Sequence, residues 1–117
     1  MSRSRSLIAT ALLVTALAVP VGITHADGGA ESRIKITKLR HTGAKGVVKS
    51  ERKRCIRRRK VSFFVIENFV SDKLEITKTN SDGKWKIRRD LDPGRYFAKV
   101  DARRGCRFDN SRVERLR

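Results

Sequence analysis

The residues that decide the fold run from Thr79 to Val100, TNSDGKWKIRRDLDPGRYFAKV. Two short segments in this run, Lys84–Arg88 and Arg95–Val100, alternate apolar with polar side chains. A period of two is typical of strands with one buried face and one exposed face. Each segment follows a turn, Ser81-Asp82-Gly83 or Asp92-Pro93-Gly94, in which glycine tolerates positive φ and proline fixes φ. The pattern predicts a small all-β sandwich.

The first residues have the layout of a secretory signal peptide. Arg3 and Arg5 form a basic start, an apolar core runs from Leu7 to Val19, and small residues lead to Ala26. This core is shorter than the roughly 20 apolar residues that a transmembrane helix needs. We therefore expect a secreted, extracytoplasmic protein that is cleaved after Ala26 and keeps no stable membrane span, with Ala30 as a second candidate cleavage site.

Cleavage after Ala26 would leave 91 residues, which is enough for one domain with a small core. The chain divides into a signal peptide (1–26), a flexible lead-in (27–32) and a β-sandwich domain (33–117). Cys55 and Cys106 are the two cysteines, and export to an oxidising space favours a single disulfide between them. A disulfide that closes a loop of about 51 residues stabilises the fold by about 4 kcal/mol in the chain-entropy model. We interpret it as structural because the chain has no CxxC pair.

Seven strands are expected in the mature chain. Glu67–Asp72 and Arg103–Asn110 are interpreted as loops, and Val113 is expected to point inward from the closing strand. The predicted strands are Arg33–Leu39, Gly46–Lys49, Val61–Ile66, Leu74–Ile76, Lys84–Arg88, Arg95–Val100 and Ser111–Leu116.

Two motifs carry a resemblance to a known family. The runs Thr79-x-x-Asp82-Gly83-x-Trp85-x-Ile87 and Leu91-x-Pro93-Gly94-x-Tyr96-x-Ala98-x-Val100 resemble the carboxypeptidase regulatory-like domain superfamily. Gly46-Val47-Val48 and Arg59-x-Val61-x-Phe63 are similar to the opening strands of that family.

The resemblance covers about Ile34 to Val100. It implies a seven-stranded immunoglobulin-like or prealbumin-like (transthyretin-like) sandwich with an accessory, non-catalytic role. It also implies that Tyr96 is a corner residue whose hydroxyl caps a backbone group. The pair Cys55 and Cys106 resembles a secreted bacterial subgroup with one disulfide.

The mature chain has no recognisable catalytic constellation. Its one histidine, His41, lies in a polar turn without a nucleophile or a metal-ligand partner in sequence. Asp82, Asp90 and Asp92 are surrounded by basic residues, so we interpret them as turn-capping residues and not as calcium ligands. We expect no enzymatic activity, no cofactor and no metal.

Charge is the feature most able to carry function. Loss of Arg3 and Arg5 with the signal would leave 27 basic and 12 acidic residues. Seven of the nine residues from Arg52 to Lys60 are basic, and the expected disulfide would place them beside Arg103–Arg107. The planar guanidinium of arginine can donate two hydrogen bonds at once to a phosphate, sulfate or carboxylate group. The candidate anion-binding residues are Arg52, Lys53, Arg54, Arg57, Arg58, Arg59, Lys60, Arg103, Arg104 and Arg107.

The expected partner of a monomeric chain is an anionic cell-wall or extracellular polymer or polysaccharide, with lipid headgroups as a further source of the same charge. We do not expect nucleic acid as the specific partner, because few aromatic side chains are placed to stack on bases. Three alternatives stay open. The domain is purely structural with incidental charge; it is a carbohydrate-binding module that uses Phe97 and Phe64; or it is an inhibitor or toxin that uses Arg52–Lys60 as its contact.

Overall fold

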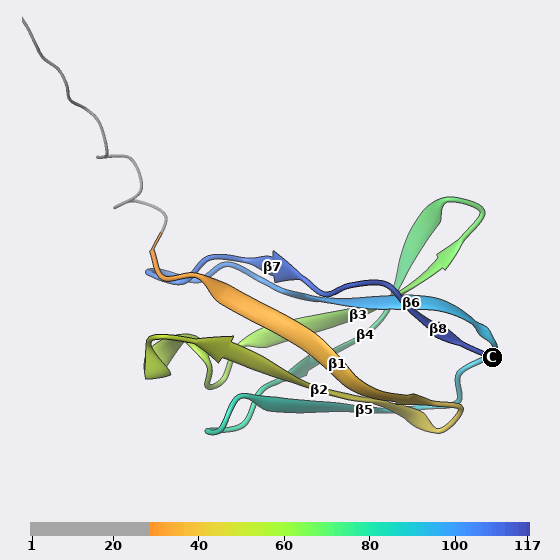
Figure 1. Cartoon of the computed structure of the whole chain (residues 1–117), viewed down its shortest axis with the longest axis horizontal. Helices are drawn as coiled ribbons and strands as arrows, with labels where there is room; N and C mark the ends of the chain where they lie inside the picture. The colour runs from red at the N-terminus through yellow and green to blue at the C-terminus, as the bar shows by residue number, and fades with distance from the viewer. Residues whose placement is uncertain (1–28) are drawn as a thin grey trace, which may run out of the picture.

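Two antiparallel sheets pack face to face in the computed structural model, which describes residues 29–117 (Figure 1). The sheet of order β1-β2-β5 contains Ser32–Arg40, Gly43–Ser50 and Lys84–Arg88. The second sheet has the order β4-β3-β6-β7, and β8 pairs with β6. Its strands are β3 (Lys60–Glu67), β4 (Val70–Lys78), β6 (Gly94–Val100), β7 (Asp109–Asn110) and β8 (Glu114–Leu116). The expected all-β sandwich is confirmed, and the expected signal peptide lies outside the described residues.

The core is built from the residues that the alternation places inward. Trp85 and Ile87 of β5 and Ala98 and Val100 of β6 are each at most 3% exposed. Phe63 of β3 connects the two sheets, because its ring lies 6.3 Å from that of Trp85 across the sandwich. Burying large apolar side chains of this kind is the main force that holds two sheets together. The stretch Thr79–Val100 thus supplies much of the interior.

Tyr96 is the corner residue that the family resemblance implies. Its hydroxyl donates to the carbonyl oxygen of Asp92 at 2.5 Å, and its ring stacks on Phe63 at 5.4 Å. Burial raises the pKa of the Tyr96 phenol, and the Asp92 carboxylate adds to this effect. The hydrogen bond closes the turn that leads into β6.

Phe64 and Phe97 lie side by side on the outer face of the larger sheet. Phe64 is directly opposite Phe97 in the register of β3 and β6, and the two rings stack at 4.8 Å between centroids. Both side chains are half-buried. Phe97 therefore contacts a neighbouring strand, and the pair does not form a flat, open platform for a sugar ring.

The boundaries differ from expectation between β3 and β4. The stretch Glu67–Asp72 is not a loop, because β3 ends at Glu67 and β4 begins at Val70. Asn68 and Phe69 form a two-residue turn with φ of 51° and 65°. A turn with two positive φ angles matches the twist of the flanking strands. The sequence gives little sign of it, because Phe69 stands where glycine is usual.

The C-terminal segment forms two short strands in place of the one expected, which raises the strand count from seven to eight. Asp109–Asn110 pairs with β6 as β7, inside the segment interpreted as a loop. Ser111 then bonds the backbone of Ala98 through its amide and its hydroxyl, which interrupts the alternation. As a result Leu116 points inward at 8% exposure, and Val113 is 50% exposed.

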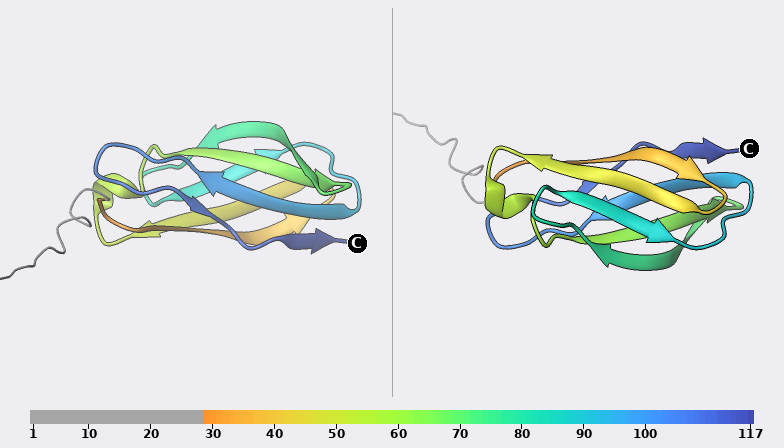
Figure 2. Two further views of the ribbon diagram at one scale, coloured as in Figure 1. Left: turned by 90° about the horizontal axis from the view of Figure 1, so that it is seen from above. Right: turned by 90° about the horizontal axis from the view of Figure 1, so that it is seen from below.

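One end of the sandwich carries the connection from β2 to β3. It contains a short 3-10 helix, η2 (Lys53–Cys55). Within residues 29–117 no helix is long and apolar enough to cross a membrane. Figure 2 shows the sandwich from two opposite sides, and its right panel looks onto β2 with β1 and β5 on either side.

Candidate anion-binding site

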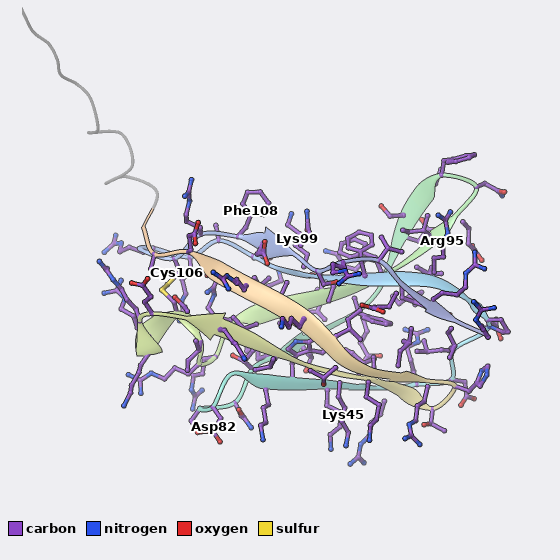
Figure 3. All side chains as sticks on the ribbon, in the orientation of Figure 1. Lys45, Asp82, Arg95, Lys99, Cys106 and Phe108 are labelled. Carbon is purple, nitrogen blue, oxygen red and sulfur yellow. A yellow bond between two sulfur atoms is a disulfide. The ribbon has the colours of Figure 1, made fainter. Side chains whose placement is uncertain are left out.

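The disulfide joins Cys55 to Cys106, as the sequence predicts. The two Cα atoms are 5.5 Å apart, and both cysteines are at most 2% exposed. Cys55 is the last residue of η2, and Cys106 closes a tight turn with Arg103 through paired backbone hydrogen bonds. The bridge therefore brings residues 52–60 and 103–107 to one end of the sandwich, where Figure 3 labels Cys106. We call these two segments the basic corner.

Arginine side chains tie the two segments of the basic corner together. The Arg103 guanidinium donates to the carbonyl oxygens of Arg57 and Arg58, both at 3.0 Å, and to that of Arg54. In return, Arg54 donates to the carbonyl oxygen of Arg104 at 3.0 Å. Carbonyl acceptors are neutral, so these contacts order the loops and leave the positive charge in place.

Arg59 is not part of the exposed patch. Its side chain is only 1% exposed, which corrects its inclusion among the anion-binding candidates. The guanidinium donates to four oxygens at 2.5 to 3.0 Å: the Ser32 hydroxyl and the carbonyls of Cys55, Asp101 and Arg107. Burial lowers the pKa of Arg59, the charge of Arg103 lowers it further, and Asp101 raises it. Arg59 thus holds β1, η2 and the C-terminal segment together.

The other candidates lie at the surface. Lys60 forms an ion pair with Asp101, with 3.6 Å between the charged atoms. Neither segment of the basic corner contains an acidic residue, and the acids within two residues of them in sequence are Glu51, Asp101 and Asp109. Six candidates have exposed side chains that make no hydrogen bond or ion pair within the described residues: Arg52, Lys53, Arg57, Arg58, Arg104 and Arg107.

The N-terminal lead-in is bonded to the basic corner. The Ala30 amide donates to the Gly105 carbonyl, and the Arg107 amide donates to the Ala30 carbonyl, both at 2.9 Å. Gly105 has a φ of 77°, and a Cβ there would lie 2.8 Å from the Arg54 guanidinium. This glycine allows the close approach of the two segments.

The polar groups considered for catalysis or metal binding lie apart from the basic corner. The two His41 ring nitrogens are each 3.1 Å from a carbonyl oxygen, of Leu91 and of Arg117. Asp82, Asp90 and Asp92 are exposed. In the part of the chain that the structure describes, no three His, Cys, Asp or Glu side chains are grouped so as to hold a metal ion.

Two features of the charged surface do not follow from the sequence alone. Nothing in the run Arg52–Lys60 distinguishes Arg59 from its neighbours, because the carbonyls that bind it come from distant segments. The second feature is a set of exposed cations shared by β1, β2 and β5: the alternation places Lys84, Lys86 and Arg88 on an outer face, but the pairing of the three strands is seen only in the structure.

The chain was compared with protein-family models, with curated proteins and with solved structures, and none of them matches it.

Proposed function

We propose that this chain is a secreted, non-catalytic binding domain whose basic corner engages an anionic cell-wall or extracellular polymer. The observation that carries the proposal is the group of six exposed cations on a covalently fixed corner whose two segments contain no acidic residue. Clustered charge of one sign attracts a polyanion at long range, and forked guanidinium donors bind its anionic groups at short range.

The geometry of the corner supports binding because its backbone is ordered in advance. The disulfide and the hydrogen bonds made by the Arg54 and Arg103 side chains hold the two loops against each other. A binding surface that is already ordered loses less conformational entropy when the ligand arrives. The six exposed side chains then need only select rotamers.

An extracytoplasmic location is part of the proposal. A disulfide persists in an oxidising compartment, and the expected signal peptide would direct the chain there. The sandwich and the Tyr96 corner support a place beside the carboxypeptidase regulatory-like superfamily, whose domains are generally accessory. The carbohydrate-binding alternative has less support, because Phe64 and Phe97 stack on each other.

The test is retention of the purified chain on immobilised heparin at increasing salt. We compare the parent with an Arg52→Gln, Arg57→Gln, Arg58→Gln variant. The matched control, Lys73→Gln, Arg95→Gln, Arg115→Gln, removes the same charge from exposed positions of the larger sheet. Arg59 is left intact because it supports the fold. The corner variant should elute at clearly lower salt than both others; equal elution of the two variants would contradict the proposal.

A further inference from the structure

The charged side chains on the outer face of the three-stranded sheet are all basic. β1, β2 and β5 contain no acidic residue, and their basic side chains are all exposed. In Figure 3 the side chain of Lys45 projects away from the sandwich on this side. We call this surface the cationic face; it consists of Arg33, Lys35, Lys38, Arg40, Lys45, Lys49, Lys84, Lys86 and Arg88.

The strand register places like charges directly against one another. Lys38 of β1 is opposite Lys45 of β2, and Lys45 is opposite Lys86 of β5. Like charges at directly opposed positions destabilise a sheet. No carboxylate on these three strands offsets the repulsion. The row of Lys38, Lys45 and Lys86 therefore lowers the stability of the fold unless an anion binds it.

Protection against aggregation does not explain the row. Lysines on edge strands prevent pairing with other molecules, and β1 and β5 are the two edges of this sheet. Lys45, however, lies on the central strand β2, which is already paired on both sides. A charge there adds repulsion and protects no edge.

Two hollows lie along the cationic face. One of about 330 Å³ is lined by five cations, Lys38, Arg40, Lys45, Lys86 and Arg88, and contains no carboxylate. Gly43 lets β2 approach β5 closely beside this hollow, since its φ is 145° and a Cβ would lie 2.1 Å from the Ile87 carbonyl oxygen. The other, of about 850 Å³, shares Lys38, Lys45 and Lys86 with the first.

The shape of the face favours a linear ligand. The six residue steps from Gly43 to Lys49 span about 20 Å, and the three strands together are about 10 Å wide. Large apolar side chains that could anchor the face in a lipid bilayer are absent from it. In residues 29–117 the exposed ones belong to the other sheet or its connections: Phe69, Val70, Ile76, Phe108 and Val113.

We propose that the cationic face binds a linear polyanion with repeated phosphate-type groups, seated across the hollows beside Gly43. The face ends at Lys49, and Ser50 and Glu51 connect it to the basic corner at Arg52. Glu31 and Glu51 line a hollow with Arg33 and Lys49 at this junction, so a polymer that continues from the face onto the corner passes two carboxylates. Only this continuation rests on the proposed function; binding at the face does not require the corner.

The experiment measures the affinity of the purified chain for inorganic polyphosphate as a function of salt. The face variant is Lys38→Gln, Lys45→Gln, Lys86→Gln, and the corner and control variants are those described above. Each lost contact to a flexible polyanion lowers the slope of log K against log salt by about 0.7, so the face variant should lose about 2. The control variant should keep the parent slope.

The outcomes distinguish the two proposals, and an unchanged slope in both variants would contradict both. If only the face variant loses slope, the cationic face is the site and the basic corner is not. If only the corner variant loses slope, this inference is wrong and the proposed function stands. A lower slope in both the face variant and the corner variant would support one continuous binding surface over the cationic face and the basic corner. Binding of orthophosphate as tight as that of polyphosphate, or a preference for phosphatidylglycerol vesicles over polyphosphate, would overturn a linear polymer as the ligand.

Discussion

At the scale of single residues, Arg59 is the cation whose role is most clearly set by burial. Its four acceptors come from Ser32, Cys55, Asp101 and Arg107, so its removal leaves oxygens from separate segments without a donor. Buried polar groups that lose their partners cost about 1 to 3 kcal/mol each. The side chain thus supports the basic corner from inside.

We predict that Arg59→Met lowers the free energy of unfolding by about 3 kcal/mol, since several buried acceptors lose their donor together. Arg59→Lys should recover little of the loss, because an ammonium lacks the planar fork that reaches four oxygens. Urea unfolding measures both. As the control, Arg57→Met at an exposed position should change stability by less than about 0.5 kcal/mol. Equal effects at positions 57 and 59 would refute the assigned role.

Tyr96 gives a prediction at alkaline pH. Its pKa is raised in the folded chain, so the neutral phenol is favoured there and the unfolded chain ionises first. Stability is therefore unaffected by this group below about pH 10 and falls as the pH rises beyond it. Tyr96→Phe should cost about 1 kcal/mol at pH 7, through loss of the bond to Asp92, and should reduce the alkaline loss.

Stability of the parent and of Tyr96→Phe is measured by urea unfolding from neutral to strongly alkaline pH. Ultraviolet titration of the parent reports ionisation of this phenol alone, because the chain has one tyrosine. An unshifted titration, or the same alkaline decline in the variant, would show that the phenol is not held neutral by burial.

At the scale of elements, β2 combines a central position in its sheet with uncompensated charge. We predict that Lys45→Glu raises the free energy of unfolding by about 0.5 to 1 kcal/mol, because the carboxylate would face Lys38 and Lys86 directly. Lys73→Glu on β4 is the control; Lys73 lies opposite Phe64, so little change is expected. A loss of stability in Lys45→Glu would mean that repulsion among Lys38, Lys45 and Lys86 does not destabilise the sheet.

The elements also show what the sequence could predict. Alternation is a local signal, and it correctly placed β5 and β6 with Trp85, Ile87 and Tyr96 inward. The β3–β4 turn and the break between β7 and β8 depend on contacts with distant strands, such as that of Ser111 with Ala98. That the two basic segments lie together was predictable, because each contains one of the two cysteines of the chain and only one intramolecular disulfide can form. The burial of Arg59 was not, because it depends on three-dimensional packing.

At the scale of the whole molecule, one covalent bond holds the connection between β2 and β3 against the C-terminal segment. We predict that Cys55→Ser with Cys106→Ser lowers the free energy of unfolding by about 4 kcal/mol, from the entropy of the loop that the bridge closes. Chemical denaturation of the parent with and without a reductant should show the same shift. A denaturation midpoint that does not move on reduction would show that the disulfide contributes little to stability.

The central claim is that the exposed arginines of the basic corner contact an anionic polymer. It is tested most directly by the salt dependence of heparin binding in the parent and in the Arg52→Gln, Arg57→Gln, Arg58→Gln variant. Three lost contacts should reduce the slope of log K against log salt by about 2. A variant that binds heparin with the slope and affinity of the parent would contradict the account.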